Sequence, residues 1–214
     1  MADKCLVQRL KAEVNNDNLE VFGSFVIEIT AASSSDMRII FSAPTLIVID
    51  KNGTITEVTS SDYQTSLSGF PVGSTITVTN KYKIKNLTLS GQKIKNIEDL
   101  KYCAIDTISL TTVAVSGLLE NVFYSTTAVR GIKLYNVNIG GTISDLVGKL
   151  SKTTQFEIQY TPITGSLDDI VEEMPDTATI NVYEQSNVTI SRAVYDTAID
   201  RGLTITIKLG NIIG

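Results

Sequence analysis

The sequence contains no histidine, and it has only two cysteines and no long apolar run. Without histidine, the chain cannot build a histidine-based catalytic triad, a histidine general base or a zinc site that needs an imidazole ligand. The two cysteines, Cys5 and Cys103, lie far apart in the sequence, so we expect two free thiols and no disulfide. No window approaches the roughly 18 apolar residues of a membrane span, so we expect no membrane insertion.

Clusters of basic residues and a secretion signal are also missing. The 18 lysines and arginines are outnumbered by 23 acidic residues, the formal net charge is -5, and the basic residues form no dense run. Phosphate binding needs such a run, so the charge pattern argues against a nucleic-acid surface. The first ten residues have no long apolar core after their positive charge, which predicts a chain made and kept in the cytoplasm unless a leader has been removed.

Pairs of apolar residues recur at a fixed interval of 24 residues without a gap. Glycine follows each of the first three pairs at the same distance, and two further apolar residues follow each glycine. A fixed period of this kind predicts a repeat architecture, in which each unit buries its apolar face against its neighbours. The pairs are Ile108/Leu110, Ile132/Leu134, Phe156/Ile158 and Ile180/Val182, and the glycines are Gly117, Gly141 and Gly165.

This spacing resembles the leucine-rich repeat, in particular the 24-residue class with a G-x-I turn after the strand. The resemblance covers roughly residues 84 to 214. It implies that the first apolar pair of each unit lies on a short strand of a parallel sheet on the concave side, and that the chain returns along the convex side. The family's turn Asn or Cys, which bonds to the backbone along a ladder, is replaced here by Val113, Val137, Thr161 and Gln185. Other groups must therefore satisfy that backbone.

The first third of the chain has a period of two instead. Phe25, Ile27 and Ile29 alternate with other residues, which predicts a strand with one buried face. Asn52-Gly53 between two β-rich runs predicts a hairpin with a type I′ turn. Residues 6 to 14 fit a helix and a strand equally well.

A stretch rich in glycine, serine and proline, residues 66 to 74, predicts a domain boundary. Residues 75 to 80 read as a strand that either closes the first domain or caps the repeats. We therefore expect a mostly β protein of the α+β class with two domains. A small β-rich attachment domain occupies residues 1–80, and a short leucine-rich-repeat-like solenoid with a parallel sheet occupies residues 81–214.

Candidate catalytic groups are few. Five acidic residues cluster in one return segment, but apolar residues between them supply a buried face, which favours a solvated surface over a paired-acid site. The Asp50-x-Asn52-Gly53 run lacks the spaced carboxylates of a calcium loop. We expect no enzyme, no cofactor and no metal site. The acidic residues are Asp168, Asp169, Glu172, Glu173 and Asp176.

The side chains between the buried residues of each predicted strand must point to the concave side, because alternation along a strand is obligatory. Three columns of such residues follow down the stack, and three tyrosines among them suggest a recognition patch, although tyrosine is also an ordinary residue on an exposed strand. Lys133 beside Glu157 predicts a cross-strand pair. The predicted binding residues are Tyr135, Tyr160, Tyr183, Lys133, Glu157 and Gln159.

The carboxyl-terminal end is apolar and has no capping helix in the pattern after its last strand. An open sheet edge of this kind invites pairing with another chain, so we expect a homo-oligomer or contact with another protein. The predicted edge residues are Ile205, Ile207, Leu209, Ile212 and Ile213.

The opening residues from Cys5 to Phe25 resemble the first residues of virion fibre or decoration proteins of crAss-like bacteriophages. With the lack of a leader, this resemblance suggests a non-enzymatic virion component, such as a head fibre, capsid decoration or tail-associated protein, with other virion proteins, itself or a host surface receptor as partners. The alternative is a free bacterial leucine-rich-repeat protein that stays in the cytoplasm and binds a protein on its concave face.

Overall fold

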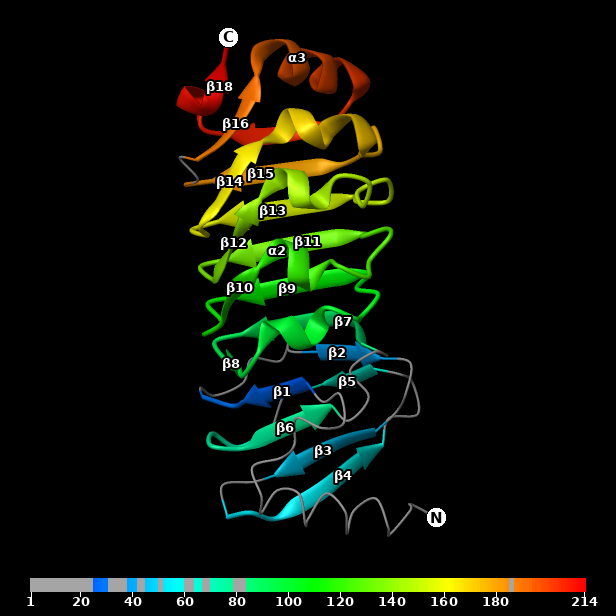
Figure 1. The fold of residues 1–214 in the computed structure, drawn as a ribbon, viewed down its shortest axis with the longest axis vertical. Helices are drawn as coiled ribbons and strands as arrows, with labels where there is room; N and C mark the ends of the chain where they lie inside the picture. Colours follow the sequence, from blue (N-terminus) through cyan, green and yellow to red (C-terminus); the bar gives the residue numbers. More distant parts are fainter. Residues whose placement is uncertain are drawn as a thin grey trace.

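The fold is a mixed α/β fold built mostly of strands, in a long stack with the antiparallel strands at one end and the last helix at the other (Figure 1). This confirms the expected class in its coarse form, including the parallel sheet. The computed structural model describes residues 25–30, 38–41, 45–49, 52–59, 64–66, 70–78, 84–184 and 187–214.

Six parallel strands form most of the larger sheet, and equivalent residues of the repeats lie opposite one another. Ile108, Ile132, Phe156 and Ile180 are successive partners at the 24-residue interval, with Leu87 before them and Ile205 after them. The predicted strand order is therefore confirmed. The strands are β7 (Ile84–Ser90), β9 (Thr107–Thr111), β11 (Gly131–Tyr135), β13 (Gln155–Gln159), β15 (Thr179–Tyr183) and β17 (Thr204–Ile207).

A second parallel sheet runs along the stack, and a short helix follows each of its first four strands. We use the word coil for one repeating unit of the stack. Each coil consists of a strand of the larger sheet, the corner after it, a strand of the second sheet, a helix and a return segment. The strands are β10 (Ser116–Leu118), β12 (Asn138–Thr142), β14 (Ile163–Ser166), β16 (Val188–Ser191) and β18 (Ile212–Ile213). The helices are α2 (Leu119–Val122), η4 (Ile143–Leu146), η5 (Leu167–Asp169), η6 (Val171–Glu173) and α3 (Arg192–Arg201), with η3 (Ile97–Leu100) in the first coil and η7 (Leu209–Asn211) before β18.

The second sheet is not paired in the register that the sequence repeat suggests. Ile139 lies opposite Gly117, and Ile163 lies opposite Gly141, so the strands slip by two residues per coil. Because side chains alternate with a period of two, a slip of two leaves every side chain on the same face. The apolar residues of both sheets consequently still point inward, into one continuous core that runs from Phe25 to Ile205.

The repeated glycine is needed where the second-sheet strand passes close to the preceding coil. Gly141 has a φ of 118°, and a Cβ there would lie 2.7 Å from Asp145 Oδ2 and 3.3 Å from the Leu119 nitrogen. L-residues with side chains rarely adopt this φ, and the neighbouring backbone cannot move away. The glycine of the G-x-(I/L) pattern is therefore explained by close packing between coils.

The strands before residue 80 pair in antiparallel fashion. Four of them form a sheet with β8, which lies after residue 80, in the order β4-β3-β6-β1-β8, while β2 and β5 extend the larger sheet beyond β7. Strand β6 pairs with β1 and β3, so it is the central strand of this sheet. The strands are β1 (Phe25–Glu28), β2 (Arg38–Phe41), β3 (Thr45–Ile49), β4 (Ile55–Thr59), β5 (Gln64–Ser66), β6 (Thr75–Val78) and β8 (Lys93–Ile94).

Both sheets cross the predicted domain boundary. Strand β1 pairs with β8 through Ile27 and Ile94, and β2 pairs with β7 through Ile39 and Leu87. The division at residue 80 stays a prediction, but the two segments share hydrogen-bonded sheets.

One prediction for the first third of the chain is confirmed, and another is corrected. Phe25, Ile27 and Ile29 are buried, as predicted. The hairpin at Asn52 also forms, but its predicted two-residue type I′ turn is wrong: Ile49 lies opposite Ile55, so the connection spans residues 50–54. Cys5, the ambiguous residues 6–14 and Gln185 lie outside the described residues.

Helix α3 was not predicted from the repeat pattern; it lies before the last strand of the larger sheet, β17, and is therefore not a capping helix after that strand. Ser191 Oγ accepts a hydrogen bond from the Val194 N–H at 3.3 Å, and Gly202 ends the helix in the left-handed conformation with a φ of 103°. These are strong start and stop signals for a helix. The helix packs Ala198 against the core next to β17.

Candidate binding surface

The predicted tyrosine patch lies on the larger sheet and the corner that follows it. Strand pairing places Lys133 beside Glu157 and Tyr135 beside Gln159, which in turn neighbours Tyr183. Tyr160 follows Gln159 at the corner. We call these six residues the tyrosine face; five lie on the strands at the positions that alternation predicts, and Tyr160 lies at the corner after β13.

Two of the three tyrosines are open to solvent. Tyr160 is 51% exposed and Tyr183 is 42% exposed, whereas Tyr135 is half-buried. The rings of Tyr135 and Tyr160 pack edge to face, with centroids 5.8 Å apart and planes at 83°. This geometry is favourable for aromatic pairs, and it holds the Tyr160 ring in place without covering it.

Lys133 and Glu157 form the predicted cross-strand ion pair, with Nζ and Oε1 3.2 Å apart. Their side chains are 40% and 14% exposed, so the carboxylate is the more sheltered partner. A pair of this exposure contributes at most about 1 kcal/mol to stability. The ion pair also changes the charge of the surface, because the two opposite charges beside the tyrosines neutralise each other.

The corner residue after each of β9, β11, β13 and β15 has a left-handed backbone conformation, which sequence reasoning missed. Thr112, Asn136, Tyr160 and Glu184 have φ values of 52°, 51°, 52° and 48°. Asparagine tolerates this region, but a β-branched or bulky residue is strained there. Asn136 was the one local signal for this conformation.

Backbone hydrogen bonds at two of these corners join successive coils. The N–H of Thr112 donates to the Tyr135 carbonyl at 2.8 Å, and the N–H of Asn136 donates to the Gln159 carbonyl at 2.9 Å. Each coil is thus tied to the next by its own backbone. Val113 and Val137 are consequently free of that task and lie buried as apolar residues.

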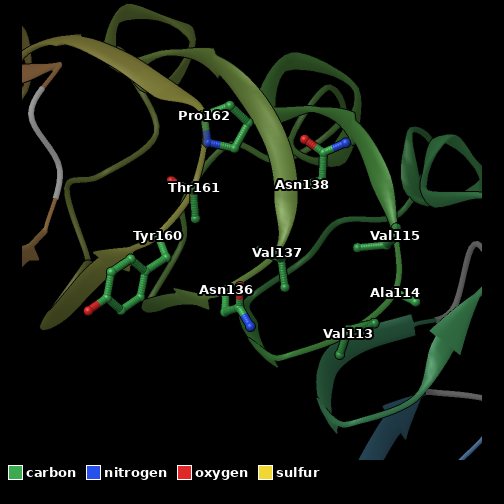
Figure 2. A pocket seen from close by; sticks show the side chains of 9 residues that line it. All are labelled: Val113, Ala114, Val115, Asn136, Val137, Asn138, Tyr160, Thr161 and Pro162. Carbon is green, nitrogen blue, oxygen red and sulfur yellow. The ribbon is translucent and has the colours of Figure 1, made fainter.

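A groove of about 520 Å³ crosses three successive corners, and sequence reasoning missed it as well. Figure 2 shows the three corners side by side, with Val137 in the middle, Tyr160 at one end and Ala114 and Val115 at the other. We call it the corner groove. Its lining residues are Val113, Ala114, Val115, Asn136, Val137, Asn138, Tyr160, Thr161 and Pro162.

The acidic cluster in the fourth coil ties neighbouring coils together, and it is more than a solvated surface. Glu173 Oε1 accepts a hydrogen bond from the Gly148 N–H at 2.6 Å, and Asp168 Oδ1 accepts one from the Ser191 N–H at 2.9 Å. Asp176 pairs with Arg201 at 2.9 Å. These carboxylates therefore bond to backbone and arginine, an arrangement that is structural and not that of a paired-acid site.

The predicted oligomer edge is only partly exposed. Ile205 lies on β17, the last strand of the larger sheet, but its side chain is only 8% exposed and packs in the core, because β17 buries alternate residues against its own coil. Ile207 and Ile212 are half-buried, and Ile213 is 51% exposed. The side chain of Leu209 lies outside the described residues. Strands β17 and β18 are the last of their sheets among the described residues.

The described part of the chain shows neither a metal site nor a membrane-spanning helix. It holds no group of three or more cysteine or acidic residues placed to bind a metal ion. None of its helices is long and apolar enough to cross a membrane. Cys103 is buried, and its Sγ donates a hydrogen bond to the Asp99 carbonyl at 3.9 Å.

Comparison with known proteins adds no relative. No family model matches the chain, and no curated protein or solved structure matches it either. The tyrosine face and the corner groove therefore have to be interpreted from their own chemistry.

Proposed function

We propose that this protein is a non-enzymatic structural and interaction protein whose residues 81–214 form a leucine-rich-repeat-like solenoid. The parallel pairing of equivalent residues in β9, β11, β13 and β15 supports the solenoid. The tyrosine face carries the interaction role. Its exposed rings of Tyr160 and Tyr183 give a partner a large, rigid contact with a hydroxyl group and little entropy to lose.

The biological setting that we propose is a bacteriophage virion, to which the protein attaches through residues 1–80 while the repeats are displayed for assembly or for binding a receptor. The support is the resemblance of the opening residues to virion fibre and decoration proteins. A free bacterial leucine-rich-repeat protein is the alternative. Electron microscopy of the purified protein alone and mixed with candidate virions separates the two, because only a virion component decorates the particles.

The first prediction concerns the tyrosine face. Replacing Tyr135, Tyr160 and Tyr183 together by Ser weakens binding of the purified protein to host cells about tenfold in a sedimentation assay, because the rigid contact with the surface receptor is lost. The melting temperature changes little, since two of the three rings are exposed. The matched control replaces Tyr102 and Tyr124, which are 56% and 61% exposed and form an edge-to-face pair elsewhere. Undiminished binding by the triple variant contradicts the role of this face and transfers binding to residues 1–80.

The second prediction concerns self-association at the end of the stack. We propose that β17 and β18 pair with a second copy or another virion protein, because an open edge with apolar neighbours invites strand pairing. Ile213 is the exposed residue of that end, so Ile213→Lys shifts the mass in solution toward the monomer. Light scattering measures this shift, with Lys152→Ala as a control at an exposed position of a return segment. A wild-type chain that stays monomeric at high concentration refutes self-association through this end.

A further inference from the structure

The corner groove differs from the rest of the surface in its charge. None of its nine lining residues carries a charge, although the chain as a whole has a net charge of -5. The nearest cation of the tyrosine face, Lys133, is already paired with Glu157. An anionic or cationic ligand would therefore lose its hydration in the groove without gaining a counter-charge, so the groove favours a neutral ligand.

The backbone around the groove is already used within the protein. The N–H groups of Thr112 and Asn136 donate to the next coil. The N–H of Ala114 donates to the Gln92 carbonyl, and its carbonyl accepts from the Ile94 N–H. Pro162 has no N–H at all. An extended peptide that binds by adding a strand needs free main-chain groups, so the groove is poorly suited to one.

The apolar floor is also too small for an amphipathic helix. Val113 and Val137 are only 3% and 4% exposed, so they offer little surface for the apolar anchors of a helix in a groove. Recognition therefore rests on the side chains that stand out at the sides of the groove. Those with exposed polar groups are Asn136, Asn138 and Tyr160.

These exposed groups match the chemistry of a sugar. A side-chain amide offers both donors and an acceptor, which is the pairing that a hydroxyl group requires. The ring of Tyr160 packs against Tyr135. Its electron-rich π face attracts the C–H groups of a sugar ring. We propose that the corner groove binds a neutral saccharide, an inference that rests on the proposed interaction role and names the ligand class for this part of the surface.

The experiment uses the labelled full chain on an array of immobilised neutral oligosaccharides, acidic oligosaccharides and proline-rich peptides. Neutral oligosaccharides are expected to retain it, and calorimetry then measures the affinity for the strongest of them. Ala114→Arg, which places a long charged side chain at one end of the groove, is expected to abolish measurable binding. Asn138→Ala removes one amide and is expected to weaken binding about tenfold. Both positions are exposed, so the melting temperatures stay close to that of the wild type.

Tyr124→Ser is the matched control, because Tyr124 is 61% exposed, does not line the groove and does not belong to the tyrosine face. It is expected to leave saccharide affinity within twofold of wild type. Retention by acidic oligosaccharides alone, by proline-rich peptides alone or by nothing on the array overturns the inference, as does unchanged affinity in Ala114→Arg. The host-cell assay with the triple tyrosine variant is separate, so a failure of the groove is distinguishable from a failure of the proposed interaction role.

Discussion

The coils from β9 onward and the antiparallel strands before residue 80 bury similar apolar residues but arrange them by different rules. In the coils, Leu110 and Leu134 are neighbours in the sheet and occupy the same environment one unit apart. In the first sheet, Ile27 lies opposite Ile76 on one side and Ile94 on the other, a combination that no other described residue has. Equivalent positions in the coils should therefore respond alike to the same substitution, whereas each position of the first sheet has its own response.

The largest expected effect tests this equivalence in the core. Leu110→Ala and Leu134→Ala each remove a fully packed side chain, so each lowers the free energy of unfolding by about 2 to 5 kcal/mol. Because the two sites are equivalent, the losses agree within about 1 kcal/mol. Chemical denaturation of both variants measures them.

Lys133→Ala is the control next to Leu134. It removes only an ion pair on the opposite face of the strand, so the loss stays below about 1 kcal/mol. Equal losses for Lys133→Ala and Leu134→Ala mean that the two faces of the strand are assigned wrongly. Very different losses at Leu110 and Leu134 mean that the coils are not equivalent.

The repeats made the middle of the larger sheet predictable, because β9, β11, β13 and β15 carry an apolar pair at the same 24-residue interval. The slip of the second sheet was not predictable, since a shift of two residues leaves the buried face unchanged and leaves no mark in the apolar pattern. The antiparallel strands could be recognised from their alternation around Ile27, but their order could not, because that order depends on pairings between distant segments.

The candidate site also has a part that was predictable from the sequence and a part that was not. Strand alternation was enough to bring Tyr135, Gln159 and Tyr183 together, since register follows the repeat. The corner groove depends on how three corners of different composition sit beside one another. Tyr160 and Pro162 stand at one end and Ala114 at the other, and no single repeat contains that information.

A smaller effect is expected where the backbone, and not a side chain, makes the close contact. Gly141→Ala combines a positive φ with a Cβ close to Asp145 and Leu119, and it should cost about 2 kcal/mol or more of unfolding free energy. Gly148 is the control, because its φ is 79° and nothing lies within 4 Å of an added Cβ. Gly148→Ala should cost about 1 kcal/mol from backbone strain alone. A Gly141→Ala variant no less stable than Gly148→Ala contradicts the close packing between coils.

The smallest expected effect is a gain in stability at the left-handed corners. Thr112 and Asn136 occupy the same place in successive coils, with φ values of 52° and 51° and the same backbone bond to the next coil. Threonine is β-branched and strained in this conformation, whereas asparagine adopts it readily. Thr112 is exposed, so its replacement disturbs no packing. Thr112→Asn should therefore raise the free energy of unfolding by up to about 1 kcal/mol, as measured by denaturation.

The reverse substitution, Asn136→Thr, is the matched control and should lower stability by a similar amount. The pair of variants compares one residue exchange at two equivalent corners, so differences in the unfolded chain cancel to a first approximation. Opposite and similar changes support the equivalence of the coils at the level of the backbone. A loss of stability in both variants contradicts it, because it means that each corner is adapted to its own residue, as the positions of the antiparallel sheet are.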